Sequence, residues 1–264
     1  MLLVVDVGNT QTHFGVFPDG ADVVSEHWRF ATVRVSTRDE LGAALSNLLG
    51  LRGLGFADID RSIVSSTVPQ LSEEWTEMAE RYLGHEMLVV GPAIRTGMPI
   101  RMDNPREVGA DRLVNAVAAY ERVQGACVVV DFGTAITYDV VSAAGEYLGG
   151  IITPGAEISI DALYERAAKL PKVELAQPRA LIGKSTVEAI RSGIVFGFAG
   201  QVDGIVGRLR DELGETTAVL ATGGLARDLV PAVRATIDEV DDLLTLTGLR
   251  LIWERNAPAT TVRE

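Results

Sequence analysis

The chain has 264 residues, which is enough for two domains of ordinary size, and its 47% apolar and 23% charged composition excludes disordered and collagen-like proteins. An excess of 36 acidic over 24 basic residues gives a net charge of −12, and the basic residues do not cluster, so neither nucleic acid nor an anionic membrane surface is an expected partner. The longest apolar runs, such as Met1–Val5, are too short for a membrane helix, and the single cysteine, Cys127, excludes a disulfide framework.

The first half of the chain predicts alternating strands and helices. Leu2–Asp6 is an apolar run that meets turn residues at Gly8-Asn9-Thr10, and Thr12–Phe17 alternates up to a second turn at Pro18-Asp19-Gly20. Thr37–Leu51 has helical spacing and a capping-box pattern formed by Thr37 and Glu40. Four further elements follow: a strand at Arg61–Thr67, a helix at Leu71–Leu83, a strand at Glu86–Val90 and an amphipathic helix at Asp111–Val123.

The second half predicts α/β units as well. Cys127–Val141 has the pattern of two strands joined by a turn, and Ala144-Gly145 closes a hairpin. The later elements are two helices at Thr186–Gly197 and Gln201–Leu213, a strand at Thr217–Thr222 and the start of a helix at Ala226–Leu229.

The two halves resemble each other at their starts. Placing Asp6 on Asp131 without a gap also aligns Val4 with Val129, Gly8 with Gly133, Thr12 with Thr137 and Val16 with Val141. We therefore predict a duplicated α/β domain, with residues 1–124 as one copy and 125–264 as the other. Each copy is expected to begin with a β-hairpin that carries an acidic residue near the end of its first strand.

Asp6-Val7-Gly8-Asn9-Thr10 is the first candidate site. A strand places the Asp6 carboxylate at its C-terminal end, and glycine allows a tight turn whose backbone N–H groups can face an anion. With the polar side chains beside it, the segment suits a phosphate group and its Mg²⁺, although a plain hairpin turn is the alternative. Recurrence at Asp131-Phe132-Gly133-Thr134-Ala135 favours phosphate binding, because two facing copies can hold a nucleotide from both sides. Neither a P-loop nor a kinase catalytic loop of the His-Arg-Asp type is present.

Three other segments each have two interpretations. Gly109-Ala110-Asp111-Arg112 precedes a helix, so Asp111 is either a helix cap or a general base beside an anion-binding Arg112. Gly183-Lys184-Ser185-Thr186 is either a phosphate-binding remnant or a helix start capped by Ser185 with Glu188. Gly223-Gly224 allows either the close approach of adenine or a tight turn. The three histidines lack metal-ligand spacing.

Together these motifs resemble the acetate kinase, sugar kinase, Hsp70 and actin superfamily, and within it the type III pantothenate kinases. The resemblance covers most of the chain, and its most specific part is DNPREVGADR (Asp103–Arg112). The other matching segments are DVGNTQTHFGVF, IVSSTVP, VVVDFGTAITYDVV, GGIITPG, GKSTVEAI and ATGGLA. The resemblance implies two actin-like (ribonuclease H-like) domains, each a mixed sheet flanked by helices.

The resemblance also implies roles for individual residues. The ATP and phosphate loop would comprise Asp6, Val7, Gly8, Asn9, Thr10, Gln11, Thr12 and His13, with Asp6 near Mg²⁺ through water. Gly109, Ala110, Asp111 and Arg112 would bind pantothenate, and Asp111 would accept the proton. Asp131 would hold a monovalent cation (K⁺ or NH₄⁺), Thr134 would contact ATP and Thr186 would contact the substrate.

The expected activity is therefore ATP-dependent phosphorylation of pantothenate to 4′-phosphopantothenate, the first step of coenzyme A biosynthesis, by a cytoplasmic homodimer whose substrate pocket lies near the dimer interface. Met102 departs from the family, in which an aromatic residue often precedes Asp-Asn-Pro, and this affects affinity more than reaction type. Two alternatives remain open: a non-catalytic regulator or ligand sensor on the same fold, and a kinase for another small hydroxyl compound.

Overall fold

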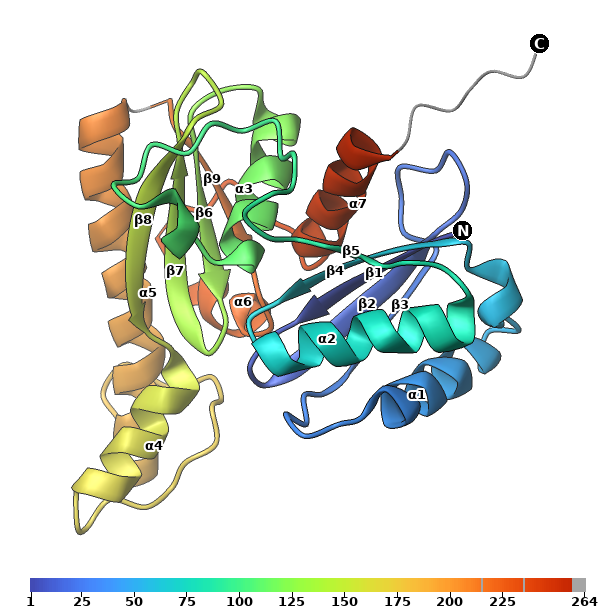
Figure 1. Cartoon of the computed structure of the whole chain (residues 1–264). Coiled ribbons are helices and arrows are strands. Elements are labelled where there is room, and N and C mark those ends of the chain that lie inside the picture. Colours follow the sequence, from blue (N-terminus) through green and yellow to red (C-terminus); the bar gives the residue numbers. More distant parts are fainter. Residues whose placement is uncertain (215, 235, 258–264) are drawn as a thin grey trace. The chain divides into compact units, whose positions relative to one another are not determined.

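The computed structural model describes residues 1–214, 216–234 and 236–257, and the chain divides into two units (Figure 1). Unit 1 comprises Met1–Met98, Asn104–Ala118 and the C-terminal segment from Leu244, and unit 2 comprises Pro99–Asp103 and Ala119–Leu243. The domain boundary expected at residues 124 and 125 lies near the start of the long segment of unit 2. The C-terminal segment, however, belongs to unit 1 rather than to the second half.

Unit 1 is built on a five-stranded sheet with the order β3-β2-β1-β4-β5. The strands are β1 (Leu2–Val7), β2 (Gln11–Phe17), β3 (Glu26–Ala31), β4 (Arg61–Ser66) and β5 (Leu88–Val89). Helices α1 (Arg38–Gly50) and α2 (Pro69–Met78) cover one face, and α7 (Leu244–Asn256) lies on the other (Figure 1). Leu3, Val5 and Val7 point from β1 into the core beneath α1 and α2, where they meet Leu45 and Trp75.

Unit 2 repeats this arrangement. Its sheet has the order β10-β9-β6-β7-β8, with the strands β6 (Cys127–Phe132), β7 (Ala135–Val141), β8 (Tyr147–Pro154), β9 (Ala218–Thr222) and β10 (Glu239–Val240). The first strand is antiparallel to the second and parallel to the fourth in both sheets. The identical order and direction confirm the predicted duplication and the expected class of two mixed sheets flanked by helices.

The helices of unit 2 are α4 (Ala156–Arg166), α5 (Thr186–Leu213) and α6 (Ala226–Leu229), while α3 (Ala110–Val123) begins in unit 1 and ends in unit 2. Val128 and Val130 of β6 and Tyr138 of β7 form the core together with Val195 and Val202 of α5. The remaining short helical turns are Phe56–Asp58, Ala79–Leu83, Pro105–Glu107 and Val230–Ala232. None of the helices in the described part of the chain has the length and apolar character needed to cross a membrane.

Two local predictions are confirmed. Helix α1 begins after Thr37, whose side chain accepts a hydrogen bond from the Glu40 N–H, while the Glu40 carboxylate accepts one from the Thr37 N–H at 2.9 Å. The hairpin predicted at Ala144-Gly145 is also present, because Gly145 donates to the Ser142 carbonyl at 3.0 Å with a left-handed φ of 77°.

The prediction of two helices between Thr186 and Leu213 is wrong, since α5 is continuous over 28 residues. The glycines that suggest a break lie on its outer side, where Gly193, Gly197 and Gly200 are exposed. The inner side, which includes Val195 and Val202, is packed into the core of unit 2. This packing outweighs the loss of about 1 kcal/mol of helix propensity that each glycine causes.

The ungapped alignment of the two hairpins is also wrong beyond the turn. Asp6 pairs with His13 across β1 and β2, whereas Asp131 pairs with Thr137 across β6 and β7. The second turn is one residue shorter, so Thr137 corresponds to His13 rather than to Thr12. Because neighbouring strand residues point to opposite faces, this single residue decides which side chains share a face with the aspartate.

Candidate active site

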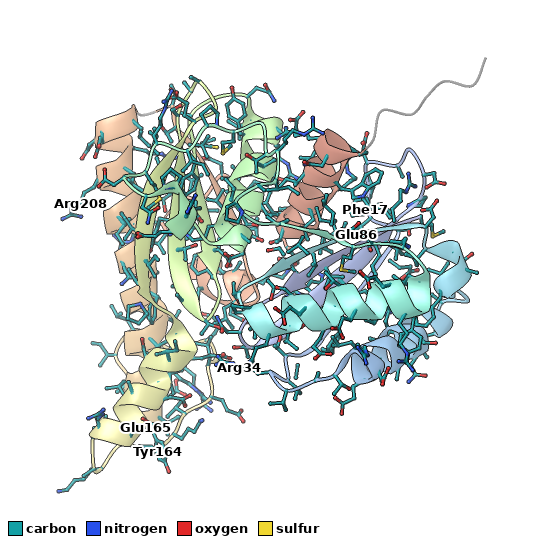
Figure 2. All side chains as sticks on the ribbon, viewed as in Figure 1. Phe17, Arg34, Glu86, Tyr164, Glu165 and Arg208 are labelled. Atoms are coloured by element: carbon teal, nitrogen blue, oxygen red, sulfur yellow. The ribbon has the colours of Figure 1, made fainter. Side chains whose placement is uncertain are left out.

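The first predicted phosphate loop, residues 6–13, is held by backbone hydrogen bonds on both sides. Gly8 donates to the Gln11 carbonyl at 3.0 Å, and a Cβ on Gly8 would lie 2.9 Å from that oxygen, so the turn requires glycine. The Thr10 carbonyl accepts a bond from the Thr32 N–H at 2.9 Å, and Arg34, labelled in Figure 2, donates to Asn9 Oδ1 at 3.1 Å. Asn9, Thr10 and Gln11 are exposed.

Three predicted members of this loop have buried side chains. Val7 is fully buried in the core, and Thr12 is buried with its hydroxyl 2.9 Å from the Thr32 hydroxyl. Their side chains therefore stabilise the loop, and only their backbone groups can take part in binding. His13 is 8% exposed, and its Nε2 lies 3.2 Å from His27 Nδ1.

His13, Asp6 and Ser65 form a row across the sheet. Asp6 pairs with His13 on β2 and with Ser65 on β4, so all three side chains share the face away from α1 and α2. Burial, together with the positive charge of Arg29 and the neighbouring His27, lowers the pKa of His13 to about 3. The imidazole is therefore neutral at physiological pH and can exchange hydrogen bonds without adding charge beside Asp6.

Asp111 also lies in unit 1, in the first turn of α3. Its carboxylate turns back over Gly109, where a Cβ would come within 2.6 Å of Asp111 Oδ1, and it accepts backbone N–H bonds from its own residue and Arg112. Burial raises the pKa of the Asp111 carboxyl, and the backbone N–H groups and the Arg112 charge lower it only partly. The side chain is thus both a helix cap and a carboxylate whose pKa lies closer to neutrality than usual, which suits a general base.

The second predicted phosphate loop, residues 131–135, lies in unit 2. Gly133 donates to the Ala135 carbonyl, and Gly155 donates to the Thr134 carbonyl, both at 3.1 Å. A Cβ on Gly155 would lie 2.7 Å from the Gly133 carbonyl oxygen, so only glycine can lie against this turn. Thr134 itself is exposed.

Gly223 fixes the surroundings of Asp131. Asp131 pairs with Thr137 on one side and with Thr222 on the other, which gives the carboxylate two hydroxyl-bearing neighbours in its row. Gly223 has a φ of 97°, and a Cβ there would overlap Asp131 Oδ1 and lie 2.6 Å from the Phe132 nitrogen. The tight-turn interpretation therefore accounts for this glycine, because it allows β9 to turn against the second phosphate loop.

Thr186 is the exposed first residue of α5. Ser185 caps the helix by accepting the Glu188 N–H at 3.3 Å, but the Glu188 carboxylate accepts a bond from the Arg179 N–H at 3.0 Å. The predicted capping box is thus only half formed, and the Arg179 N–H lowers the pKa of Glu188. Gly183 packs on this first turn, where a Cβ would lie 2.6 Å from Ala189 Cα, so the segment is a helix start.

The predicted residues divide between the units. Asp6–His13 and Gly109–Arg112 belong to unit 1, whereas Met102, Asp131, Thr134 and Thr186 belong to unit 2. Met102 lies over β8, with its Cγ 3.8 Å from a Cβ placed on Gly149. Ser65 and Thr222 were not predicted as site residues. Each lies near the end of a predicted strand. It is placed beside an aspartate only because that strand pairs in parallel with a strand distant in sequence.

Within the described residues, no three His, Cys, Asp or Glu side chains gather into a metal-binding group. A metal cage made only of protein ligands of these types is therefore not present there. The single carboxylate of Asp6 at the first loop fits a Mg²⁺ ion that keeps most of its waters and is held mainly by the phosphates of a nucleotide.

The sequence model of the type III pantothenate kinase family matches residues 2–208. This chain belongs to that family. A type III pantothenate kinase from Moorella thermoacetica is 52% identical over 97% of this chain and 100% of its own length. Another from Streptomyces avermitilis is 53% identical over 98% of this chain and 100% of its own.

Solved structures with lower identity share the fold. A protein assigned as a 2-dehydro-3-deoxygalactonokinase from Sinorhizobium meliloti has a TM-score of 0.60 at 14% identity, covering 98% of this chain and 100% of that chain. The ethanolamine utilization protein EutJ from Carboxydothermus hydrogenoformans has a TM-score of 0.56 at 15% identity, covering 95% and 89% respectively. These similarities confirm the duplicated actin-like architecture that the sequence predicts for a type III pantothenate kinase.

Proposed function

We propose that the chain transfers the γ-phosphoryl group of ATP to the primary hydroxyl of pantothenate, giving 4′-phosphopantothenate and ADP at the first step of coenzyme A biosynthesis. The observation that carries this proposal is identity of about half over nearly the whole chain to proteins named type III pantothenate kinases. The Asp103–Arg112 stretch contains Asp111, a partly buried carboxylate of raised pKa, which is the chemical group that the reaction needs.

Asp111 is the proposed proton acceptor. As the pantothenate oxygen approaches the γ-phosphorus, its proton passes to the Asp111 carboxylate, the new O–P bond forms and the bond from the γ-phosphorus to ADP breaks. Arg112 is the proposed partner of the pantothenate carboxylate, because a planar guanidinium can hold both oxygens. Gly109 and Ala110 complete this substrate-binding stretch, and Thr186 is a further proposed substrate contact.

The nucleotide is proposed to bind at the two phosphate loops, residues 6–13 and Thr134. Mg²⁺ is proposed at Asp6 through water, and a monovalent cation, K⁺ or NH₄⁺, at Asp131. The donor sets fit these ions, since each offers one carboxylate flanked by neutral hydroxyl or imidazole groups in the same row. When bound, the cations would neutralise charge on the phosphates as the γ-phosphoryl group is transferred.

We further propose a homodimer formed along α5. Gly193, Gly197, Gly200 and Gly207 recur at helical spacing, and a Cβ on any of them would meet nothing within 4 Å. Phe196 is 38% exposed on the same helix and lines a hollow of about 560 Å³. A line of glycines lowers helix stability, but it allows the close approach of a second helix backbone. A second copy of this chain, presenting the same helix, is the proposed occupant.

Interface variants test the dimer. Gly197→Glu should give a monomer by sedimentation, with pantothenate affinity reduced more than ATP affinity, because Thr186 lies on the same helix. Gly50→Glu is the matched control, since Gly50 is an equally open glycine at the end of α1. A wild-type monomer, or a monomeric variant that binds pantothenate as tightly as its parent, would contradict the shared pocket.

A coupled assay of ADP release tests the function itself. The purified protein is given ATP, Mg²⁺ and K⁺ with pantothenate or with a panel of small alcohols. Pantothenate should be the preferred acceptor by a wide margin. A different preferred alcohol would assign the chain to another substrate, and no turnover with any acceptor would favour a ligand sensor. The proposed location is the cytoplasm, where ATP is made and used.

A further inference from the structure

Strand β4 and Thr67, the residue that follows it, carry four side-chain hydroxyls, and Ser65 differs from the others in its hydrogen bonding. Ser62 Oγ lies 2.8 Å from His85 Nε2, Ser66 Oγ donates to the Val68 carbonyl at 2.8 Å, and Thr67 Oγ1 donates to the Val7 carbonyl at 3.1 Å. The Ser65 side chain is fully buried, yet its Oγ has no hydrogen-bond partner among the described residues. A buried hydroxyl without a partner is unfavourable, and such groups often contact a ligand or a water that the protein itself does not supply.

The position of Ser65 indicates what that ligand is. Ser65 lies directly opposite Asp6 in the parallel ladder of β1 and β4, so both side chains point to the same face of the sheet. Asp6 stands at the start of the first phosphate loop, and His13, on its other side, is neutral. The hydroxyl therefore adds a neutral oxygen beside a carboxylate, which is a combination that suits a hydrated divalent cation.

Unit 2 contains the same combination. Thr222 lies opposite Asp131 in the parallel ladder of β6 and β9, and it is 2% exposed. A carboxylate and a small hydroxyl thus occupy corresponding positions at the loop-forming end of both sheets. The sequences that begin at these hydroxyl residues differ, since Ser65 starts Ser-Ser-Thr and Thr222 starts Thr-Gly-Gly. The recurrence favours a role in cation binding at both loops, with the rest of each row setting which ion binds, over a side chain that merely fills space.

We propose that the Ser65 hydroxyl and the Asp6 carboxylate together hold one water of the hydrated Mg²⁺ ion that accompanies ATP at the first phosphate loop. This inference rests on the proposed function. Ser65 acts through that water, so it is a positioning residue and not a catalytic one. Its removal should change the dependence on Mg²⁺ and leave the metal-free protein intact.

The test compares Ser65→Ala with Ser62→Ala. Ser62 is a matched control because it is buried on the same strand but already bonded to His85. Calorimetric titration with ATP is carried out in Mg²⁺ and in EDTA, and thermal unfolding is measured without ligand. Ser65→Ala should bind MgATP about 10-fold more weakly, in the range found for groups that orient metal ligands, while ATP affinity in EDTA stays within about twofold. Its unfolding midpoint should be unchanged or about 2–4 °C higher.

Ser62→Ala should show the opposite behaviour, with a lower unfolding midpoint and unchanged MgATP affinity. Ser65→Cys retains the side-chain volume with a weaker donor, and it should reproduce the Mg²⁺ effect of alanine even if alanine disturbs the packing. A Ser65→Ala protein that is destabilised but binds MgATP normally would overturn the inference, as would wild-type ATP affinity that is the same with and without Mg²⁺. These results are separate from the proposed function, which fails only if the wild-type protein does not phosphorylate pantothenate.

Discussion

The two units share a strand order but differ in the side chains beside their aspartates. In unit 1 the row across the sheet contains His13, Asp6 and Ser65, and it continues to Arg29, which pairs with His13 on β3. In unit 2 the corresponding row contains Thr137, Asp131 and Thr222. The row in unit 1 therefore includes the guanidinium of Arg29 and the imidazole of His13. In unit 2 the residues directly beside Asp131 are the two threonines, which carry small hydroxyls.

We propose that this difference gives the duplicated scaffold two kinds of cation site. An ion that keeps its water shell needs hydrogen-bond partners for those waters, and the longer polar side chains of unit 1 can supply them. A monovalent cation is less strongly hydrated, and the carboxylate and hydroxyl oxygens of unit 2 are proposed to bind it directly. The one-residue difference in turn length places Thr137, and not Tyr138, beside Asp131.

The helices that follow the last strand of each sheet also differ. Helix α3, after β5, carries Asp111 in its first turn, and burial raises the pKa of this carboxyl. Helix α7, after β10, follows Asp241, which accepts a hydrogen bond from the Leu243 N–H at 2.8 Å and pairs with Arg122 Nη2 at 2.6 Å. Asp241 is therefore held in an ion pair, whereas Asp111 is the aspartate proposed to accept a proton.

Asp111→Asn should give the largest effect. Turnover should fall roughly 10²–10⁴-fold, the range attributed to general acid–base catalysis, while ATP affinity and the unfolding midpoint are maintained. Asp241→Asn is the matched control: asparagine can still accept the Leu243 N–H, but it loses the charge paired with Arg122, so it should lose no more than about 1 kcal/mol of stability with normal turnover. Kinetics and thermal unfolding of both variants check this expectation. An Asp111→Asn protein that unfolds but shows no separate catalytic defect would leave Asp111 as a helix cap alone.

His13 should make unit 1 sensitive to acid in a way that unit 2 is not. Its folded pKa of about 3 lies below the ordinary value of 6.5, so between these pH values the unfolded chain binds a proton that the folded chain does not. Stability is therefore lost as the pH falls from 6.5 toward 3, by at most about 1.4 kcal/mol per pH unit from this group.

Urea unfolding across this pH range should show that the free energy of unfolding falls less steeply with decreasing pH for His13→Gln than for the wild type. Thr137→Val, the corresponding change in unit 2, removes no titrating group and should leave the pH slope as it is. Equal slopes for His13→Gln and the wild type would mean that the imidazole is not held neutral.

Glycine substitutions in the two turns should give the smallest effect. A Cβ at Gly8 would lie 2.9 Å from the Gln11 carbonyl oxygen, whereas a Cβ at Gly133 would have its nearest contact at 3.5 Å. Gly8→Ala should therefore destabilise the protein by about 1–2 kcal/mol, and Gly133→Ala by no more than about 0.5 kcal/mol. Denaturant unfolding of the two variants measures the difference, and equal losses would show that the turns are equally tight.

Local patterns in the sequence predicted much of this molecule. The capping box at Thr37, the turn at Gly145 and the aspartates at the ends of β1 and β6 all depend on a few neighbouring residues, and the structure contains them. The sequence also predicts the duplication, because the hairpin at the start of each half has an aspartate followed two residues later by a glycine, at Asp6 and Gly8 and at Asp131 and Gly133.

Features that depend on distant pairing were not predicted. Strand β3 alternates between exposed and half-buried positions, and helix α7 covers a sheet formed by the other end of the chain. The continuity of α5 depends on its buried side, which the glycines on its outer side obscure. Ser65 and Thr222 are chemically ordinary in sequence, and they gain a role only because a parallel strand places each beside an aspartate.

A cation titration of two variants tests the central claim that the two aspartates serve different ions. Pantothenate-dependent ADP release is measured for wild type, Asp6→Asn and Asp131→Asn while Mg²⁺ is varied at saturating K⁺, and then while K⁺ is varied at saturating Mg²⁺. Asp6→Asn should raise the Mg²⁺ concentration needed for half-maximal activity by about 10-fold and leave the K⁺ requirement unchanged, and Asp131→Asn should do the reverse. Equal shifts in both titrations for either variant, or wild-type activity that needs no monovalent cation, would contradict this account.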